Sequence, residues 1–185
     1  MSVSTPHRHR FSVADFHRMA AVGILSPDDR VELIEGELIR MAPMGNWHAF
    51  VVSELHRLLL LGLGERAVVR SQTPLVLGTD SEPEPDVLVL RRRDDQYRDA
   101  LPEARDVQLL VAVADTTLEV DRGVKLSLYA RHGVPEVWIV NRRERQVEMH
   151  RQPVAGRYGD VRLRRTGLVA PADFPGLAIA VEGLF

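Results

Sequence analysis

The sequence contains no cysteine, and it has no long apolar run. The absence of cysteine excludes a disulfide framework, a cysteine-ligated zinc site and a cysteine nucleophile. No apolar run approaches the ~20 residues that a membrane-spanning helix needs. No apolar segment follows the charged N-terminus, as a secretory signal would require. We therefore expect a cytoplasmic protein without a membrane partner.

Lysine is almost absent as well. Lys125 is the only lysine among 24 basic residues, and all the others are arginine. Lysine is a compact charge with a titratable amine, whereas arginine is a planar fork that stays protonated. If the sequence prefers arginine in general, Lys125 is a lysine that remains by chance. Alternatively, Lys125 has a chemical role that arginine could not perform.

An excess of positive charge is also missing. The net charge is -2, from 24 basic and 26 acidic residues, which does not indicate a globally basic nucleic-acid binder. A local basic face remains compatible with this balance. The runs Arg91, Arg92, Arg93 and Arg142, Arg143 are candidate phosphate contacts, although such runs usually serve only as solvated surface.

The length and the apolar content suit one folded domain. The chain has 185 residues, of which 45% are hydrophobic. We expect residues 1–10 to form a flexible tail and residues 11–185 to form a single domain. Hydrophobic spacing and turn residues predict helices at 12–23, 46–64 and 117–132 and strands at 31–35, 38–41, 67–70, 74–77, 87–90, 107–114, 136–141, 146–150, 160–164 and 178–181.

The last predicted helix joins two almost wholly apolar strands. Strands 107–114 and 136–141 should be buried on both faces and should be parallel neighbours. Thr116 and Glu119 predict a capping box at the start of the helix between them. The spacing predicts one apolar helix face formed by Val120, Val124, Leu128 and Tyr129. The sequence thus indicates an α/β (α+β) domain with a mixed central sheet flanked by helices.

One acidic segment leads directly into a buried strand. Residues 81–86 read SEPEPD and precede the apolar run VLVL, so Asp86 should lie at the mouth of the sheet. Carboxylates are the ligands that Mg²⁺ prefers, which makes Asp86 a candidate metal ligand. The alternative is an ordinary turn with solvated acids.

A second candidate pair lies on the predicted helix 117–132. Asp121 and Lys125 are four residues apart, so they share one face and form at least an ordinary surface pair. If the preceding strand ends near Asp86, Lys125 can instead point into a carboxylate site. There its charge would orient an attacking water or stabilise a pentavalent phosphate.

Other titratable residues carry weaker signals. Glu32, Glu35 and Glu37 bracket a glycine turn, and each can equally be solvated. The histidines show no metal-ligand spacing, and only His48, near a helix start, is a weak candidate for facing the site. Neither a phosphate-binding loop nor a dinucleotide-binding glycine motif is present.

Several motifs together resemble a known family. The segments ELIEGE at 32–37, EPD at 84–86, DRGVK at 121–125 and GVPEVW at 133–138, with Tyr129, resemble the Uma-type family of restriction-endonuclease-like proteins in the PD-(D/E)xK nuclease superfamily. The resemblance covers about residues 11 to 185. It implies a restriction-endonuclease-like core and hydrolysis of DNA phosphodiester bonds with Mg²⁺ or Mn²⁺. It is also compatible with a homodimer.

The resemblance also implies roles for individual residues. Asp86 would be the first metal ligand, together with the backbone carbonyl of Val113. Lys125 would position water or stabilise charge, and Glu35 would match the early acidic position. Asp121, Tyr129 and Glu37 would be supporting positions.

The sequence departs from this family at one metal-binding position. The family has a pattern like V-E-V-A in the strand after Asp86, but residues 111–114 read VAVA. Ala112 therefore stands where a glutamate is expected, and its methyl group cannot coordinate a cation. Asp115 would face the other side of a continuing strand unless the chain bends, and Glu119 is expected to cap the helix. A naturally degenerate member, an altered sequence and a relocated ligand all remain open.

Three functions follow from these alternatives. The first is a Mg²⁺-dependent DNA endonuclease with reduced or absent activity. The second is a non-catalytic member that binds nucleic acid or protein. The third is a structural homodimer with a vestigial acidic pocket.

Overall fold

The computed structural model describes residues 8–185. Most of the predicted flexible tail, at residues 1–10, lies outside the described residues. Within the described part, the Arg10 side chain donates to the Glu35 carbonyl at 2.8 Å, and Arg8 pairs with Glu37 at 3.5 Å. None of the helices within residues 8–185 has the length and apolar character needed to cross a membrane.

Six strands form the central sheet, and smaller elements surround it. The helices are α1 (Val13–Ala21), α2 (Asn46–Leu63), α3 (Leu118–Val120) and α4 (Leu126–Arg131), with a π-helical turn at Asp121–Lys125. The strands are β1 (Val31–Ile34), β2 (Glu37–Arg40), β3 (Ala67–Ser71), β4 (Val87–Arg91), β5 (Val107–Ala114), β6 (Glu136–Asn141), β7 (Gln146–Val154), β8 (Arg157–Arg164), β9 (Leu168–Val169) and β10 (Ile179–Ala180).

The sheet is mixed, as the sequence predicts. Its strand order is β3-β4-β5-β6-β7-β8. Strands β5 and β6 are parallel, and the other neighbouring pairs are antiparallel. The α/β class and the parallel pairing of the two apolar strands are therefore confirmed. Strands β7 and β8 form a longer hairpin than expected.

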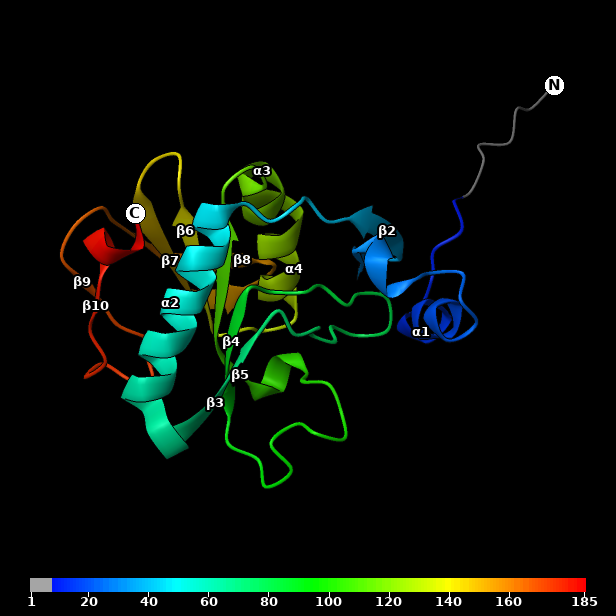
Figure 1. The fold of residues 1–185 in the computed structure, drawn as a ribbon, viewed down its shortest axis with the longest axis horizontal. Helices are drawn as coiled ribbons and strands as arrows, with labels where there is room; N and C mark the ends of the chain where they lie inside the picture. Colours follow the sequence, from blue (N-terminus) through cyan, green and yellow to red (C-terminus); the bar gives the residue numbers. More distant parts are fainter. Residues whose placement is uncertain (1–7) are drawn as a thin grey trace.

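Both faces of the sheet are covered (Figure 1). Side chains alternate between two apolar clusters along each inner strand, because successive residues of a strand point to opposite faces. Leu109, Val111 and Val113 of β5 pack on the side of α2 and the C-terminal segment. Leu110 and Ala114 pack on the side of α4. The strand after Asp86 is thus fixed in register by burial on both faces.

Helix α1 and the β1–β2 hairpin form an arm beside the main body, which we call the hairpin arm (residues 13–40; Figure 1). Ser12 and Asp15 cap α1 in both directions, as predicted. The arm is attached through backbone hydrogen bonds between Leu33 and Glu82. His17 of α1 also contacts the Glu82 carboxylate at 2.7 Å.

Two predictions about secondary structure are wrong. Residues 74–77 do not form a strand, because their backbone amides donate to two separate segments, at Pro83 and Ser81 on one side and at Pro102 on the other. The predicted helix 117–132 is interrupted by the π-helical turn Asp121–Lys125.

The start and the apolar face of that helix also differ from expectation. The predicted capping box of Thr116 and Glu119 does not form; Thr117 occupies the cap position without a side-chain bond to the backbone. A π turn holds an extra residue, which rotates the chain and changes which side chains share a face. Val120 and Val124 are therefore 47% and 50% exposed instead of packed in the core.

Candidate active site

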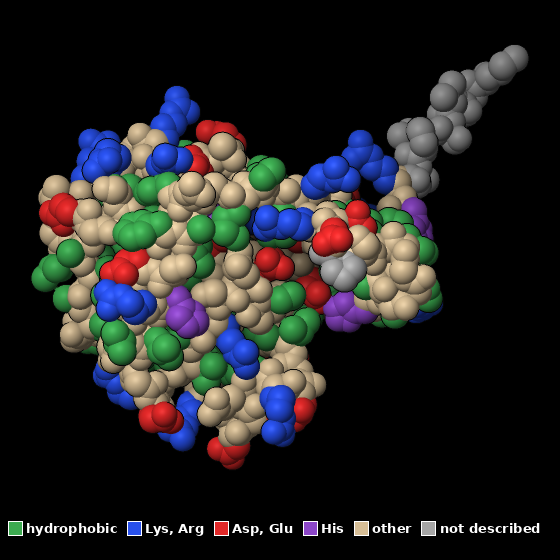
Figure 2. Space-filling model, viewed as in Figure 1, with side chains coloured by type: hydrophobic (Ala, Val, Ile, Leu, Met, Phe, Trp, Pro, Cys, Tyr) green, Lys and Arg blue, Asp and Glu red, His purple; other side chains and the backbone are tan. Residues whose placement is uncertain are grey.

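The candidate site lies where β4 begins and β5 ends. Since β4 runs antiparallel to β5, with Val87 opposite Val111, Asp86 comes opposite Ala112 and next to the Val113 N–H. A cavity of about 410 Å³ opens here between the hairpin arm, the N-terminus of α2 and the π turn. Figure 2 shows acidic side chains gathered in the hollow between the main body and the arm. The titratable residues that line this cavity are Arg30, Glu32, Arg40, His48, Glu84, Asp86, Asp115, Asp121 and Lys125.

Both oxygens of Asp86 have protein partners. The Val113 N–H donates to Oδ2 at 2.7 Å, and the His48 ring nitrogen Nε2 contacts Oδ1 at 3.0 Å. The hydrogen bond to Asp86 raises the pKa of His48, against the opposing effect of burial. Nδ1 of His48 is buried without a hydrogen-bond partner. Asp86 is therefore held in place by the backbone of β5 and the first turn of α2.

The lone lysine points into the same cavity. The Lys125 ammonium lies 2.7 Å from Glu32 Oε1, and their side chains are only 14% and 4% exposed. The other oxygen of Glu32 accepts the Glu84 N–H at 3.2 Å. The acidic residue of the hairpin that reaches Lys125 is thus Glu32, which occupies the middle of β1.

The other two hairpin acids face away from the cavity. Glu35 pairs with Arg131 of α4, and Glu37 pairs with Arg8. Neither lines the cavity. Strand alternation does not separate Glu32 from Glu35, because Leu33 and Ile34 are both buried. Glu35 follows the end of β1, in the turn with φ 49°.

Asp121 and Tyr129 lie close to Lys125 and are buried. Burial raises the pKa of Asp121, while Lys125 and a hydrogen bond from Thr117 at 2.6 Å act against this shift. Burial also raises the pKa of Tyr129 well above its ordinary value. Asp121 does not pair directly with Lys125, because the π turn directs the lysine to Glu32.

The residues present do not fit a magnesium centre with two carboxylates from β4 and β5. Ala112 is 8% exposed and lies between Leu110 and Ala114 on the α4 side of the sheet. Asp115 does not replace the missing acid, because it pairs with Arg142 at 2.6 Å. Across residues 8–185, no three His, Asp or Glu side chains are arranged to hold a metal ion.

The run Arg91, Arg92 and Arg93 lies at the opposite end of β4. Arg91 lies five residue steps along the strand from Asp86, or about 17 Å. Arg93 pairs with Asp95 at 2.7 Å, and Arg92 pairs with Glu65 at 3.4 Å.

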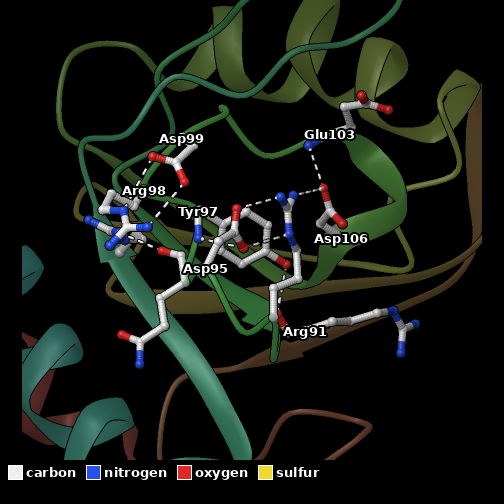
Figure 3. Close-up of polar contacts among 10 residues, drawn as sticks. Arg91, Asp95, Tyr97, Arg98, Asp99, Glu103 and Asp106 are labelled. Carbon is white, nitrogen blue, oxygen red and sulfur yellow. Dashed lines mark hydrogen bonds and ion pairs between the residues drawn. The ribbon is translucent and has the colours of Figure 1, made fainter.

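A dense set of polar contacts surrounds this run (Figure 3). Tyr97 donates its hydroxyl to the Arg91 carbonyl at 2.7 Å, and the Arg93 guanidinium lies over the Tyr97 ring. Arg98 pairs with Asp99 at 3.2 Å. These arginines are therefore engaged within the protein and distant from the cavity.

Comparisons with known proteins agree with this architecture. A family model described as "Uma2: Putative restriction endonuclease" matches residues 13–182. The crystal structure of a "putative nuclease belonging to DUF820" from Anabaena variabilis is similar, with a TM-score of 0.76 and 16% sequence identity. The likeness covers 95% of this chain and 97% of that chain, and at this identity it shows the fold. No curated protein matches the chain.

Proposed function

The chain belongs to the Uma2 family of restriction-endonuclease-like proteins, and from this premise we propose that it is a DNA nuclease with an impaired metal site. The substrate would be the phosphodiester backbone, and Mg²⁺ or Mn²⁺ would be the metal. Ala112 would lower the affinity for that metal, because hard cations need several oxygen ligands and a methyl group supplies none.

The observation that supports this proposal is the position of Ala112. Its neighbour Val113 donates to Asp86, so residue 112 is within one residue of the candidate metal ligand. Its side chain faces the α4 side, as do Leu110 and Ala114. Lys125 precedes α4 directly and lines the cavity at this end of β5. A carboxylate at 112 would therefore enter the site between Asp86 and Lys125.

The remaining residues are suited to a phosphate group. A metal ion held by Asp86 and a restored carboxylate at position 112 would supply water activation and neutralisation of phosphate charge. Lys125 supplies a fixed positive charge that would stabilise the developing charge on a phosphate. Burial raises the pKa values of Glu84 and Asp121, while Lys125 acts against the shift at both carboxyl groups.

Restoring the carboxylate tests this proposal. Cleavage of supercoiled and single-stranded DNA with Mg²⁺ or Mn²⁺ would be measured for the unchanged chain, Ala112→Glu and Ala112→Gln. The glutamine variant is the matched control, because it fills the same space without the charge. We expect Ala112→Glu alone to cleave, and Lys125→Ala added to it to abolish the cleavage.

Two results would contradict the proposal. If the unchanged chain cleaves DNA as fast as Ala112→Glu, a relocated acid such as Asp115 completes the site and the role of Ala112 is wrong. If no variant cleaves either DNA, the assignment as an impaired nuclease fails.

A second candidate function is a non-catalytic homodimer in the cytoplasm that binds nucleic acid or protein. It is favoured by the internal partners of the site's acids: Asp86 contacts His48, Glu32 pairs with Lys125, and Asp115 pairs with Arg142. DNA binding by every variant without cleavage by any of them, together with a dimeric mass in solution, would select this alternative.

A further inference from the structure

Two arginines at the rim of the cavity make no side-chain hydrogen bond or ion pair with any described residue. Arg30 precedes β1 and Arg40 ends β2, and Val31 pairs with Arg40 across the hairpin, so the two are near neighbours. Both side chains are exposed and both line the cavity. Within residues 8–185, neither guanidinium makes a hydrogen bond or an ion pair. This distinguishes them from Arg92, Arg93 and Arg98, each of which has a carboxylate partner.

The backbone that carries these arginines is firmly held. Arg30 has φ 38° and ψ 64°, a left-handed conformation that costs a non-glycine residue free energy. The preceding turn is closed by hydrogen bonds between Ser26 and Asp29 in both directions. The Met41 N–H donates to the Arg30 carbonyl at 2.8 Å, which ties the two ends of the hairpin together. The rim therefore presents both guanidinium groups from a fixed base.

The acidic side chains and the unpaired basic side chains occupy different parts of the cavity. Its acids include Glu84 and Asp86, and its one lysine is neutralised by Glu32. A phosphodiester that approached this floor would meet negative charge first. Among the described residues that line the cavity, Arg30 and Arg40 are the basic side chains without an ion-paired carboxylate, so the rim is where a strand passing over the cavity would be held.

We propose that Arg30 and Arg40 form a subsite for the phosphates of a nucleic-acid strand that crosses the cavity. This rests on the proposed function, because the cavity is taken as the site where the backbone would be cut. Guanidinium groups suit the role, since each can donate two parallel hydrogen bonds to a phosphate. The subsite replaces the run Arg91, Arg92 and Arg93 as the expected phosphate contact.

Binding without cleavage tests the subsite. Fluorescence anisotropy of a fluorescein-labelled duplex and of its single strand would be followed in EDTA over a range of salt concentrations. The test variant is Arg30→Gly with Arg40→Ala; glycine removes the side chain and adopts the left-handed backbone without strain. The control variant, Arg92→Ala with Arg98→Ala, removes the same charge from the distant end of β4.

We expect the rim variant to bind about a hundredfold more weakly, at about tenfold for each charge-assisted contact. The slope of log affinity against log salt should fall by about two, one for each lost phosphate contact. The control variant should match the unchanged chain in both quantities. The probe that shows the larger loss identifies whether duplex or single strand occupies the rim.

The failure of the subsite and that of the proposed function can be told apart. Equal binding by the rim variant and the unchanged chain, or equal losses in rim and control variants, would overturn the subsite even if Ala112→Glu cleaves DNA. No binding of either probe by the unchanged chain at low salt would overturn it too. A selective loss in the rim variant supports the subsite even if Ala112→Glu fails to cleave.

Discussion

The charged side chains near the two ends of β4 differ in whether they are paired with one another. At the end that follows Arg91, arginines and acids neutralise each other: Arg93 pairs with Asp95, and Arg98 pairs with Asp99. At the end that begins after Asp86, acids line a cavity, and within residues 8–185 the rim guanidinium groups make no hydrogen bond or ion pair. At the first end, the charged side chains of the loop pair with one another. At the second end, the rim guanidinium groups are available to a ligand.

If the proposed rim subsite binds DNA, a run of like charges in a sequence is a poor guide to a binding surface. Three consecutive arginines at 91–93 stand out in the sequence, whereas Arg30 and Arg40 are ten residues apart and do not. A hairpin brings the latter pair together beside the cavity. Whether an arginine already has a carboxylate partner is decided by the fold and not by its neighbours in the chain.

The largest effect is expected at the cavity end, from Asp86→Asn in the Ala112→Glu background. We expect the restored cleavage to fall by about a hundredfold or more, because one oxygen ligand and its charge are lost. The measurement is the initial rate of supercoiled-DNA cleavage. Asp106→Asn at the other end of β4 is the control and should leave the rate unchanged. An equal fall in the cleavage rate of both variants would contradict a functional difference between the two ends of β4.

A paired charge elsewhere in the molecule should matter for stability alone. Arg122 donates to both oxygens of Glu148, whose side chain is 4% exposed. Arg122→Ala would leave that buried carboxylate without its guanidinium partner, at a cost of about 2 kcal/mol; the partial exposure of Arg122 reduces the value usual for buried pairs. Urea denaturation measures the loss, and an unchanged midpoint would contradict it.

The same pair has a defined pH dependence. Burial alone would raise the pKa of Glu148, but the contact with His150 and hydrogen bonds from Arg122, Asn141 and Gln146 outweigh it and lower the pKa below the ordinary value of 4.5. The carboxylate therefore contributes stability above pH 4.5, and this contribution is lost as the pH falls toward the folded-state pKa. The destabilisation by Arg122→Ala should shrink in acid, and a pH-independent difference would argue against the pairing.

Tyr97→Phe, at the Arg91 end of β4, should lower the free energy of unfolding and leave the affinity for DNA unchanged. The change removes a buried hydrogen bond to the Arg91 carbonyl, at a cost of about 1 kcal/mol. Thermal unfolding gives the stability, and the anisotropy assay gives the affinity for DNA. A clear loss of affinity with an unaltered fold would show that this end contacts DNA after all.

The smallest effect is expected for His48→Gln. The pKa of His48 is raised above 6.5 by its hydrogen bond to Asp86, so the pair contributes stability below pH 6.5 that is lost as the pH rises through the folded-state pKa. Because the pair is only half-buried, we expect a difference below about 1 kcal/mol. Denaturation of both proteins at acidic and alkaline pH measures it. If the two proteins differ more in stability at alkaline pH than at acidic pH, the prediction is contradicted.

Much of the fold could be predicted because burial leaves a strong periodic signal. The almost wholly apolar sequence of β5 predicted a strand covered on both faces, and the Ser12 cap predicted the start of α1. The break at Asp121–Lys125 could not be predicted, because a π turn has no periodic signal of its own and depends on side chains such as Arg122 that reach other strands.

The sequence predicted part of the candidate site. Asp86 and Lys125 do line one cavity, since strand order brings the start of β4 to the end of β5. Glu35 was preferred over Glu32 because a glycine turn hides which hairpin residues face inward. His48 gave only a weak signal, because its partner Asp86 lies far along the chain.

The most direct test of the central claim is the binding of Mn²⁺ without DNA. Isothermal titration calorimetry would compare the unchanged chain with Ala112→Glu, Ala112→Gln, and Ala112→Glu combined with Asp86→Asn. If the missing carboxylate disables the site, only Ala112→Glu will show saturable binding at one site. Binding of Mn²⁺ by the unchanged chain as tightly as by Ala112→Glu would contradict the account.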